Sequence, residues 1–300
     1  MKIGFGSLTC PTWNLQTIVT QASSLGFGGI ELRGLCGELH LPLVPELAAD
    51  PQTVRAMLEE QKVELVCLGA SATLTAKDPR EAARQKGAIV EFMELASRLG
   101  CPNVRVFLGE VGKRDNPRAA LSRAAEALIS LAPIASRLNV RILIENGGDF
   151  PSSADLWFVI DAVESPFVGA CWNQCHAMTL GERPTTSIPR LGRKLGMIHL
   201  CDAAFDESGA LLEYKPLGQG HAEVGREIEL LKGIVYDGYL MFEQPKLWVD
   251  SLPPPETTLP AAAKFIKDAL AAKQPVLSAY KGDKNAPKFT SRSPASSPAG

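Results

Sequence analysis

The sequence lacks the features that are typical of membrane, secreted, disulfide-rich and nucleic-acid-binding proteins. Its 300 residues contain no run of 18 apolar residues that would predict a membrane span, and the opening MKIGFG lacks the apolar segment of a signal peptide. The seven cysteines are irregularly spaced and include no CxxC pair, which favours buried, reduced thiols. The net charge is −2, and no dense Lys/Arg run precedes the last thirty residues. These absences favour a cytoplasmic protein with neither nucleic acid nor membrane as a partner.

The sequence does contain a regular alternation of short apolar runs and longer helical stretches, repeated eight times. The apolar runs are nearly continuous, which is typical of parallel strands buried on both faces. The predicted strands are Lys2–Thr9, Gly29–Gly34, Glu64–Ser71, Asn103–Gly109, Arg141–Gly147, Val168–His176, Met197–Ala203 and Gly238–Gln244. The predicted helices are Leu15–Leu25 capped by Asn14, Pro51–Glu60, Arg80–Leu99, Arg118–Leu138, Leu156–Val163 capped by Ser153, Arg226–Tyr236 and Pro260–Ala272.

Eight such units predict one α/β domain, a (β/α)₈ TIM barrel over residues 1–276. An open, doubly wound sheet is the alternative, but it seldom needs eight uniform units. The first strand is also not followed by a glycine-rich dinucleotide fingerprint, and no GxxxxGK[ST] phosphate signature occurs. From Pro275 the composition turns to Lys, Ser, Pro, Gly and Ala, so residues 277–300 are predicted to be a disordered tail.

Polar side chains collect where the predicted strands end, which is where TIM barrels carry their chemistry. None of the four histidines falls on a predicted helix; His40 and His221 lie in loops expected at the same end of the barrel. A carboxylate that ends an apolar strand would be costly to bury without a partner. The ends of strands five to eight carry Glu145 and Asn146, Asn173 and His176, His199 and Asp202, and Glu243 and Gln244.

Two interpretations of these strand ends differ in which positive group neutralises the negative charge of the glutamates. Carboxylate and amide oxygens with an imidazole nitrogen would suit Mg²⁺, Mn²⁺ or Zn²⁺. Alternatively, Glu145 and Glu243 could pair with Arg or Lys from neighbouring loops. We favour the metal, because strands four, six and seven supply no basic residue at their ends. Three basic residues, Arg33, His40 and Lys246, lie in the predicted loops. They could bind hydroxyl or phosphate oxygens of a ligand, or they could be ordinary solvated charges.

From residue 1 to about 270 the chain resembles the xylose-isomerase-like barrel superfamily of sugar isomerases and epimerases. The resemblance is carried by the opening KIGF, the LGFGGIE segment at 25–31, the IEN segment at 144–146 and the PLGQG loop at 216–220. It implies a metal-dependent isomerase or epimerase that acts on a small sugar or polyhydroxylated carbonyl compound through an enediolate. Two alternatives stay open, a keto-inositol dehydratase-type lyase and a non-catalytic sugar-binding or partner subunit, and self-association into a homo-oligomer is also left open.

The resemblance also implies roles for residues. Glu145, Asn173, His199 and Glu243 correspond to the family's metal ligands, with Mn²⁺ or Mg²⁺ favoured over Zn²⁺, and Glu145 and Glu243 to its acid and base. His176, Arg33, His221 and Lys246 are the predicted substrate-binding residues. One position departs from the family, since Asn173 stands where an aspartate is usual. An amide brings no charge, so metal binding should be weaker. Alternatively, the change marks a member that has lost both metal and activity. The nuclease branch needs further histidines on strands three and four, which this chain lacks.

Overall fold

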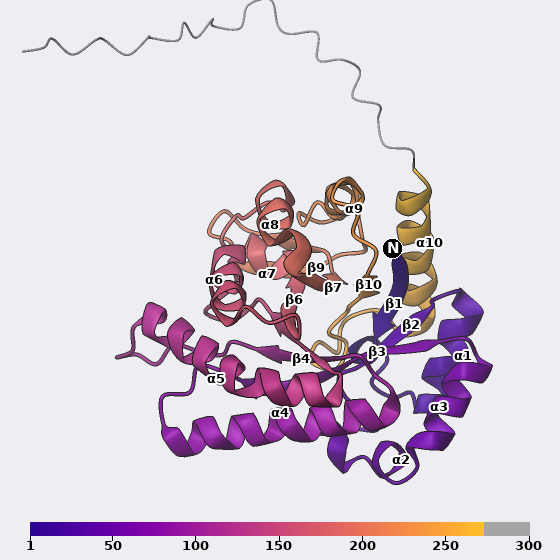
Figure 1. Ribbon diagram of the computed structural model, residues 1–300. Helices are drawn as coiled ribbons and strands as arrows, with labels where there is room; N and C mark the ends of the chain where they lie inside the picture. The colour runs from indigo at the N-terminus through magenta and orange to yellow at the C-terminus, as the bar shows by residue number, and fades with distance from the viewer. Residues whose placement is uncertain (273–300) are drawn as a thin grey trace, which may run out of the picture.

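The computed structural model describes residues 1–272, which form a closed barrel of eight parallel strands surrounded by helices (Figure 1). The predicted tail, 277–300, lies outside the described residues. Strand order around the barrel is β1-β10-β7-β6-β5-β4-β3-β2, so neighbours along the chain are neighbours in the sheet and β10 closes it against β1. The strands are β1 (Lys2–Gly6), β2 (Gly29–Leu32), β3 (Glu64–Thr73), β4 (Asn103–Phe107), β5 (Arg141–Glu145), β6 (Val168–Asn173), β7 (Leu195–Leu200) and β10 (Tyr239–Phe242).

Helices connect the strands, and most of them begin at a residue whose side chain caps the first turn. Asn14, Asp50, Asp78 and Asn116 each accept a hydrogen bond from a backbone N–H of the helix that follows. The longer helices are α1 (Leu15–Leu25), α3 (Pro51–Glu60), α4 (Pro79–Leu99), α5 (Pro117–Leu138), α6 (Ser153–Val163), α8 (Pro184–Leu191), α9 (Val224–Gly233) and α10 (Pro255–Ala271). The short helical segments are η1 (Ser7–Thr9), η2 (Leu41–Leu43), α2 (Pro45–Ala48), α7 (Gln174–Met178) and η3 (Gly192–Lys194).

The eight-unit pattern and the barrel are confirmed, whereas several predicted boundaries are wrong. The sixth strand ends at Asn173, not at His176, because the Asn173 side chain caps α7 by accepting from the Cys175 N–H at 3.1 Å. His176 therefore lies on a helix. Helix α6 is capped by Ser152, one residue before the predicted Ser153. The prediction also missed α8 and an antiparallel hairpin of β8 (Ala203–Phe205) and β9 (Leu211–Tyr214).

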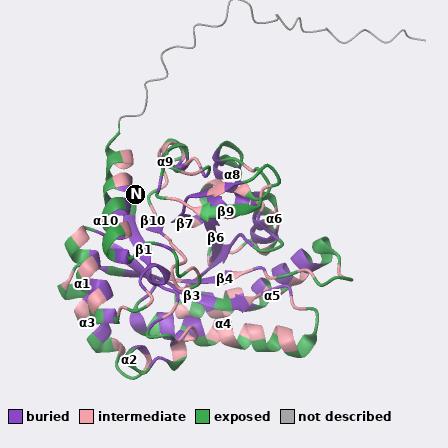
Figure 2. Cartoon of the chain, turned by 180° about the vertical axis from the view of Figure 1, so that it is seen from behind, coloured by how far each residue is buried: buried purple, intermediate pink, exposed green. Residues whose placement is uncertain are grey.

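The apolar core has two parts. Figure 2 shows buried residues on the strands of the barrel and on the helices around it. Most buried side chains form one cluster that includes residues of the helices, and this cluster packs the helices against the outside of the barrel. Because side chains alternate along a strand, a second, smaller cluster fills the barrel itself. Its members are Val66, Cys67, Leu143, Cys171, Met197, Tyr239 and Met241. Among residues 1–272, no helix has the length and apolar character needed to span a membrane.

Helix α9 carries an unusual buried acid, Glu227. The side chain is 1% exposed, and neither of its carboxylate oxygens has a hydrogen-bond partner within the described part of the chain. Burial, and after it the charge of Asp202, raises the pKa of Glu227 well above its ordinary value. Glu227 therefore keeps its proton in the folded protein at a pH where the unfolded chain has lost it.

We expect Glu227→Gln to stabilise the protein increasingly as the pH rises. A group whose pKa is raised on folding contributes stability below its unfolded pKa, and this contribution falls by about 1.4 kcal/mol per pH unit above that pKa. Glutamine cannot ionise, so the gain in the free energy of unfolding should be small near pH 4.5 and grow toward pH 7. Urea unfolding at each pH measures it. Glu229→Gln, two residues along the helix and half-exposed, is the control and should show no such trend.

Candidate active site

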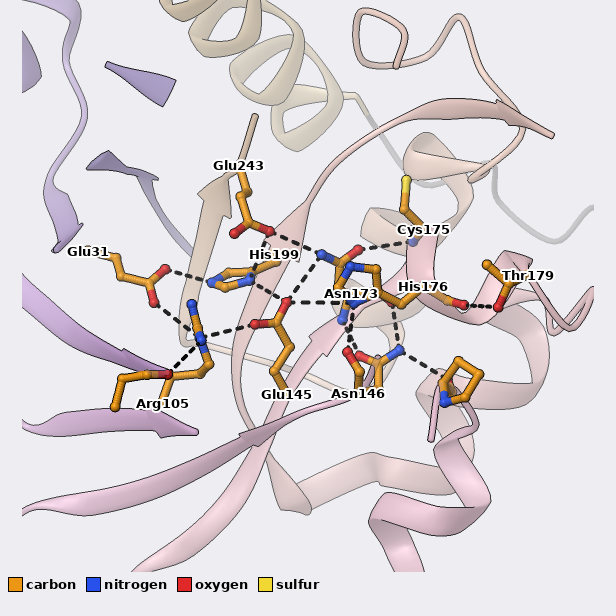
Figure 3. A network of polar contacts seen from close by, with 12 residues as sticks. Glu31, Arg105, Glu145, Asn146, Asn173, Cys175, His176, Thr179, His199 and Glu243 are labelled. Atoms are coloured by element: carbon orange, nitrogen blue, oxygen red, sulfur yellow. Dashed lines mark hydrogen bonds and ion pairs between the residues drawn. The ribbon is translucent and has the colours of Figure 1, made fainter. Parts of the chain in front are cut away.

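The four predicted ligands come together at the C-terminal ends of their strands (Figure 3). Glu145 ends β5, Asn173 ends β6, His199 lies near the end of β7 and Glu243 follows β10. The Asn173 amide nitrogen lies 3.3 Å from Glu145 Oε1 and 3.1 Å from Glu243 Oε2. His199 Nδ1 lies 2.9 Å and 3.3 Å from the same two oxygens. The imidazole and the amide thus bridge the two carboxylates.

Two further charged residues, Glu31 of β2 and Arg105 of β4, complete this buried cluster. Arg105 is 1% exposed, and its Nε lies 3.0 Å from Glu145 Oε2 and 3.7 Å from Glu31 Oε1. These contacts are ion pairs without directed hydrogen bonds, and the two carboxylate oxygens that lack a hydrogen-bond partner are the ones that face the guanidinium. Glu31 Oε2 also contacts His199 Nε2 at 2.7 Å. The glutamate of β5 therefore has a permanently positive neighbour.

The cluster favours its ionised forms. Carboxylate oxygens only accept, so His199, which faces one from each ring nitrogen, carries hydrogen on both. Burial alone would lower the pKa of His199, but its acidic neighbours, Cys171 and the carboxylates of Glu243 and Glu145, raise it well above the usual value. Burial alone would raise the pKa of Glu145, but His199 and Arg105 hold it well below the usual range. Glu145 is thus a firmly ionised carboxylate at neutral pH.

His176, at the edge of this cluster, has a fixed ring orientation. Its Nδ1 lies 2.6 Å from the backbone oxygen of Asn146, and a carbonyl oxygen can only accept. Nδ1 therefore carries the hydrogen, which leaves Nε2 with a free lone pair when the ring is neutral. The Asn146 side chain is structural, because it joins the ends of β5 and β6: its Nδ2 donates to Asn173 O at 2.9 Å and its Oδ1 accepts from Asn173 N at 2.8 Å.

A cavity of about 280 Å³ opens above the cluster, and it matches a small ligand. Its polar lining comes from Arg33, Arg105, Glu145, Asn173, His176 and Glu243. Its apolar lining includes Leu8, Phe107, Phe205, Pro245 and Trp248. Of the two predicted catalytic carboxylates, Glu145 is 1% exposed, whereas the Glu243 side chain is 14% exposed and faces the cavity more openly.

The other predicted site residues divide into two groups. Arg33 joins His176 in the cavity wall, whereas His221 and Lys246 do not line the cavity. His221 instead accepts a hydrogen bond from the Phe205 N–H, which holds the loop that follows β9 against β8. Lys246 donates to the backbone oxygen of Asp250 at 2.6 Å. His40 pairs with Glu91 of α4 at 2.8 Å, also away from the cavity.

The sequence prediction missed Arg105 and Glu31. The absence of a basic residue at the end of strand four argues against a basic partner for Glu145, and this expectation is wrong, because Arg105 pairs with it. Arg105 comes from the middle of β4 and points into the barrel. A charged residue in the middle of an otherwise apolar strand was the available signal, since such a residue needs a buried counter-charge.

The predicted ligand set does not fit a hard divalent cation. Asn173 has one oxygen, and that oxygen is the cap of α7, so its NH₂ group faces the two glutamates. Arg105 stands against Glu145, so a cation bound to that carboxylate would lie beside a guanidinium. Glu145, Cys171 and His199 do offer three donor atoms within 4.8 Å of one another, which could hold a metal ion.

Several solved structures share the fold of this barrel. No curated protein matches the sequence. Among solved structures, IolI has a TM-score of 0.78 and 18% identity, covering 90% of this chain and 98% of its own. D-psicose 3-epimerase from Clostridium cellulolyticum H10 has a TM-score of 0.74 and 16% identity, with 90% and 99% covered. The 3-keto-D-glucoside 4-epimerase YcjR from E. coli has a TM-score of 0.72 and 15% identity, with 89% and 99% covered.

These likenesses concern the fold, and the family is decided by sequence. The family model described as xylose isomerase-like TIM barrel matches residues 19–269, which is most of the chain. The match runs from α1 to α10 and includes Glu145, Asn173, His199 and Glu243. The chain therefore belongs to the xylose isomerase-like TIM barrel family.

Proposed function

We propose that this chain is an isomerase- or epimerase-type enzyme that moves a proton at a carbon next to a carbonyl in a small polyhydroxylated compound. The observation that carries the proposal is the pair of carboxylates, Glu145 and Glu243, bridged by His199 and Asn173 at the floor of a small cavity. Removing such a proton needs a base beside the carbon and positive charge beside the oxygen that becomes an enediolate. Both lie within the cluster.

The two glutamates are suited to different roles. Glu145 is enclosed by Arg105 and His199, which hold its pKa low and make it a weak base. We assign to it the task of fixing His199 and Asn173 in place. Glu243 is partly exposed to the cavity, and its Oε2 accepts from Asn173. We therefore assign proton removal from the substrate to Glu243.

His176 is our choice for the second proton-transfer group. It lines the cavity, and its hydrogen bond to Asn146 leaves Nε2 free to receive or return a proton. An epimerase needs a proton donor on the face opposite to the base, whereas an isomerase moves the proton along one face. Glu243 follows β10 and His176 follows β6, and β7 lies between these two strands in the barrel, so the two groups reach the cavity from different strands.

The relatives support the substrate class. The IolI structure contains a bound zinc atom, and the epimerase from C. cellulolyticum was solved with D-tagatose. A cavity of about 280 Å³ with both apolar and charged walls suits a ligand of that kind. We assign no step to a metal, because Arg105 stands against Glu145 and the Asn173 oxygen caps α7.

The proposal predicts solvent exchange that needs no knowledge of the product. Incubation of the protein in D₂O with ketoses, aldoses and keto-polyols should place deuterium on the carbon next to the carbonyl of at least one compound. Deprotonation precedes the choice of product, so exchange should be detectable even where net conversion is small. Proton NMR measures the loss of the C–H signal. Absence of exchange with a compound that binds in the cavity would contradict proton transfer.

A further inference from the structure

The floor of the cavity is built around two arginines. Gly69 of β3 lies opposite Arg105 of β4 in the sheet register. A Cβ on Gly69 would stand 2.9 Å from Arg105 Nη2 and 2.7 Å from Arg33 Cδ, closer than real Cβ atoms approach. Gly69 does not have a positive φ, so its role is to leave space. The absent side chain is what admits both guanidiniums to the end of the barrel.

The two guanidiniums place positive charge beside the carboxylates at the end of the barrel. Three carboxylates, those of Glu31, Glu145 and Glu243, meet here, and Arg105 stands directly between the first two. A divalent ion bound to Glu145 would lie beside a guanidinium already 3.0 Å from that carboxylate, and like charges at such separations repel. It would also need the Asn173 oxygen, which caps α7.

Arg33 has an unused donor. The residue is 8% exposed, and its Nη2 donates to Ser71 Oγ at 2.8 Å. Its Nη1 is buried and has no hydrogen-bond partner among the described residues, although the residue lines the cavity. A buried guanidinium N–H without an acceptor is costly, and a ligand oxygen bearing negative charge would satisfy it with a strong hydrogen bond. Ionised oxygens are what an enediolate presents.

We infer that this site works without a divalent cation, and that Arg105 and Arg33 supply the positive charge that a metal would otherwise bring, with Arg33 binding the anionic oxygens of the ligand. Arg105 balances the buried glutamates, so the guanidinium of Arg33 stays available to the cavity. The inference deepens the proposed function and rests on it for the identity of the ligand as an enediolate. The absence of a metal requirement rests on the geometry of Arg105 and Asn173 alone.

Metal and anion binding test the inference on the full-length protein. After chelator treatment, calorimetry with Mn²⁺, Mg²⁺ and Zn²⁺ should show no stoichiometric binding, and the protein as purified should carry no stoichiometric metal by elemental analysis. Oxalate, a planar dianion with the adjacent oxygens of an enediolate, should bind the metal-free protein. Arg33→Met should weaken oxalate binding about 10- to 100-fold, the effect of losing a charge-assisted hydrogen bond. Arg84→Met removes an exposed arginine of α4 that pairs with Glu81 and does not line the cavity, so it should leave oxalate binding unchanged.

A reversal variant tests the same idea in the other direction. Arg105→Leu removes the guanidinium, and Asn173→Asp replaces the amide NH₂ by a negatively charged oxygen that is not needed as the cap of α7. The folded double variant should therefore gain Mn²⁺ affinity over wild type. Stoichiometric metal in the wild-type protein, oxalate binding only after metal is restored, or no oxalate binding at all would overturn the inference. These wild-type measurements decide it even if the double variant does not fold. Lack of deuterium exchange with all sugars, by contrast, bears on the proposed function alone.

Discussion

Glu243→Gln should lower the rate of deuterium exchange into a substrate by about 10²- to 10⁴-fold, the usual contribution of a general base. Glutamine keeps the shape of the side chain but cannot accept the substrate proton. The side chain is 14% exposed and its carboxylate is bridged by Asn173 and His199, so the variant should fold and retain most of its stability. Exchange followed by NMR at saturating substrate isolates the loss to the chemical step.

Two comparisons make this result specific. Glu213→Gln removes a carboxylate from β9 that is exposed and paired with Lys215, and its exchange rate should equal that of wild type. Substrate affinity of Glu243→Gln should change far less than its rate, because the assigned role is proton removal rather than binding. Wild-type exchange in Glu243→Gln would reject Glu243 as the base and leave His176 as the remaining candidate in the cavity wall.

The fold could be predicted from the sequence because each strand and helix of the barrel has a pattern that is visible within its own segment. Near-continuous apolar runs and amphipathic helices are properties of single segments, and eight of them in order fit one architecture. Boundaries were less certain where one residue suits two structures. Asn173 can end a strand or cap a helix, and it does both, which is why the prediction extended the sixth strand to His176.

The site was partly predictable for a similar reason. Residues at the ends of parallel strands in a barrel must meet, so Glu145, Asn173, His199 and Glu243 were expected together. The direction of a side chain within a strand depends on register and on its neighbours. Arg105 points into the barrel because it alternates with Val104 and Val106, and the missing side chain of Gly69 on the adjacent strand leaves the space that it needs. The direction of the Asn173 amide likewise depends on the helix it caps.

The second large effect concerns stability. Arg105→Leu should lower the free energy of unfolding by about 3–5 kcal/mol, the usual cost of leaving a buried charge without its partner. Glu31 and Glu145 are both almost fully buried and both face this guanidinium. Urea unfolding at pH 7 measures the loss, and an unchanged dependence on urea concentration would show that the unfolded state is comparable.

A buried arginine elsewhere in the same barrel provides the control. Arg141, at the start of β5, is largely buried and donates only to the backbone oxygen of Lys194, with no carboxylate partner among residues 1–272. Its replacement by Leu leaves no uncompensated carboxylate, so the loss should be clearly smaller than for Arg105→Leu. Adding Glu145→Gln to Arg105→Leu should recover part of the stability, because it removes one of the stranded charges, and the double-mutant cycle gives the energy that couples the pair. Equal losses for the two arginines, together with no recovery in the double variant, would mean that Arg105 contributes by packing and not as the counter-charge of the glutamates.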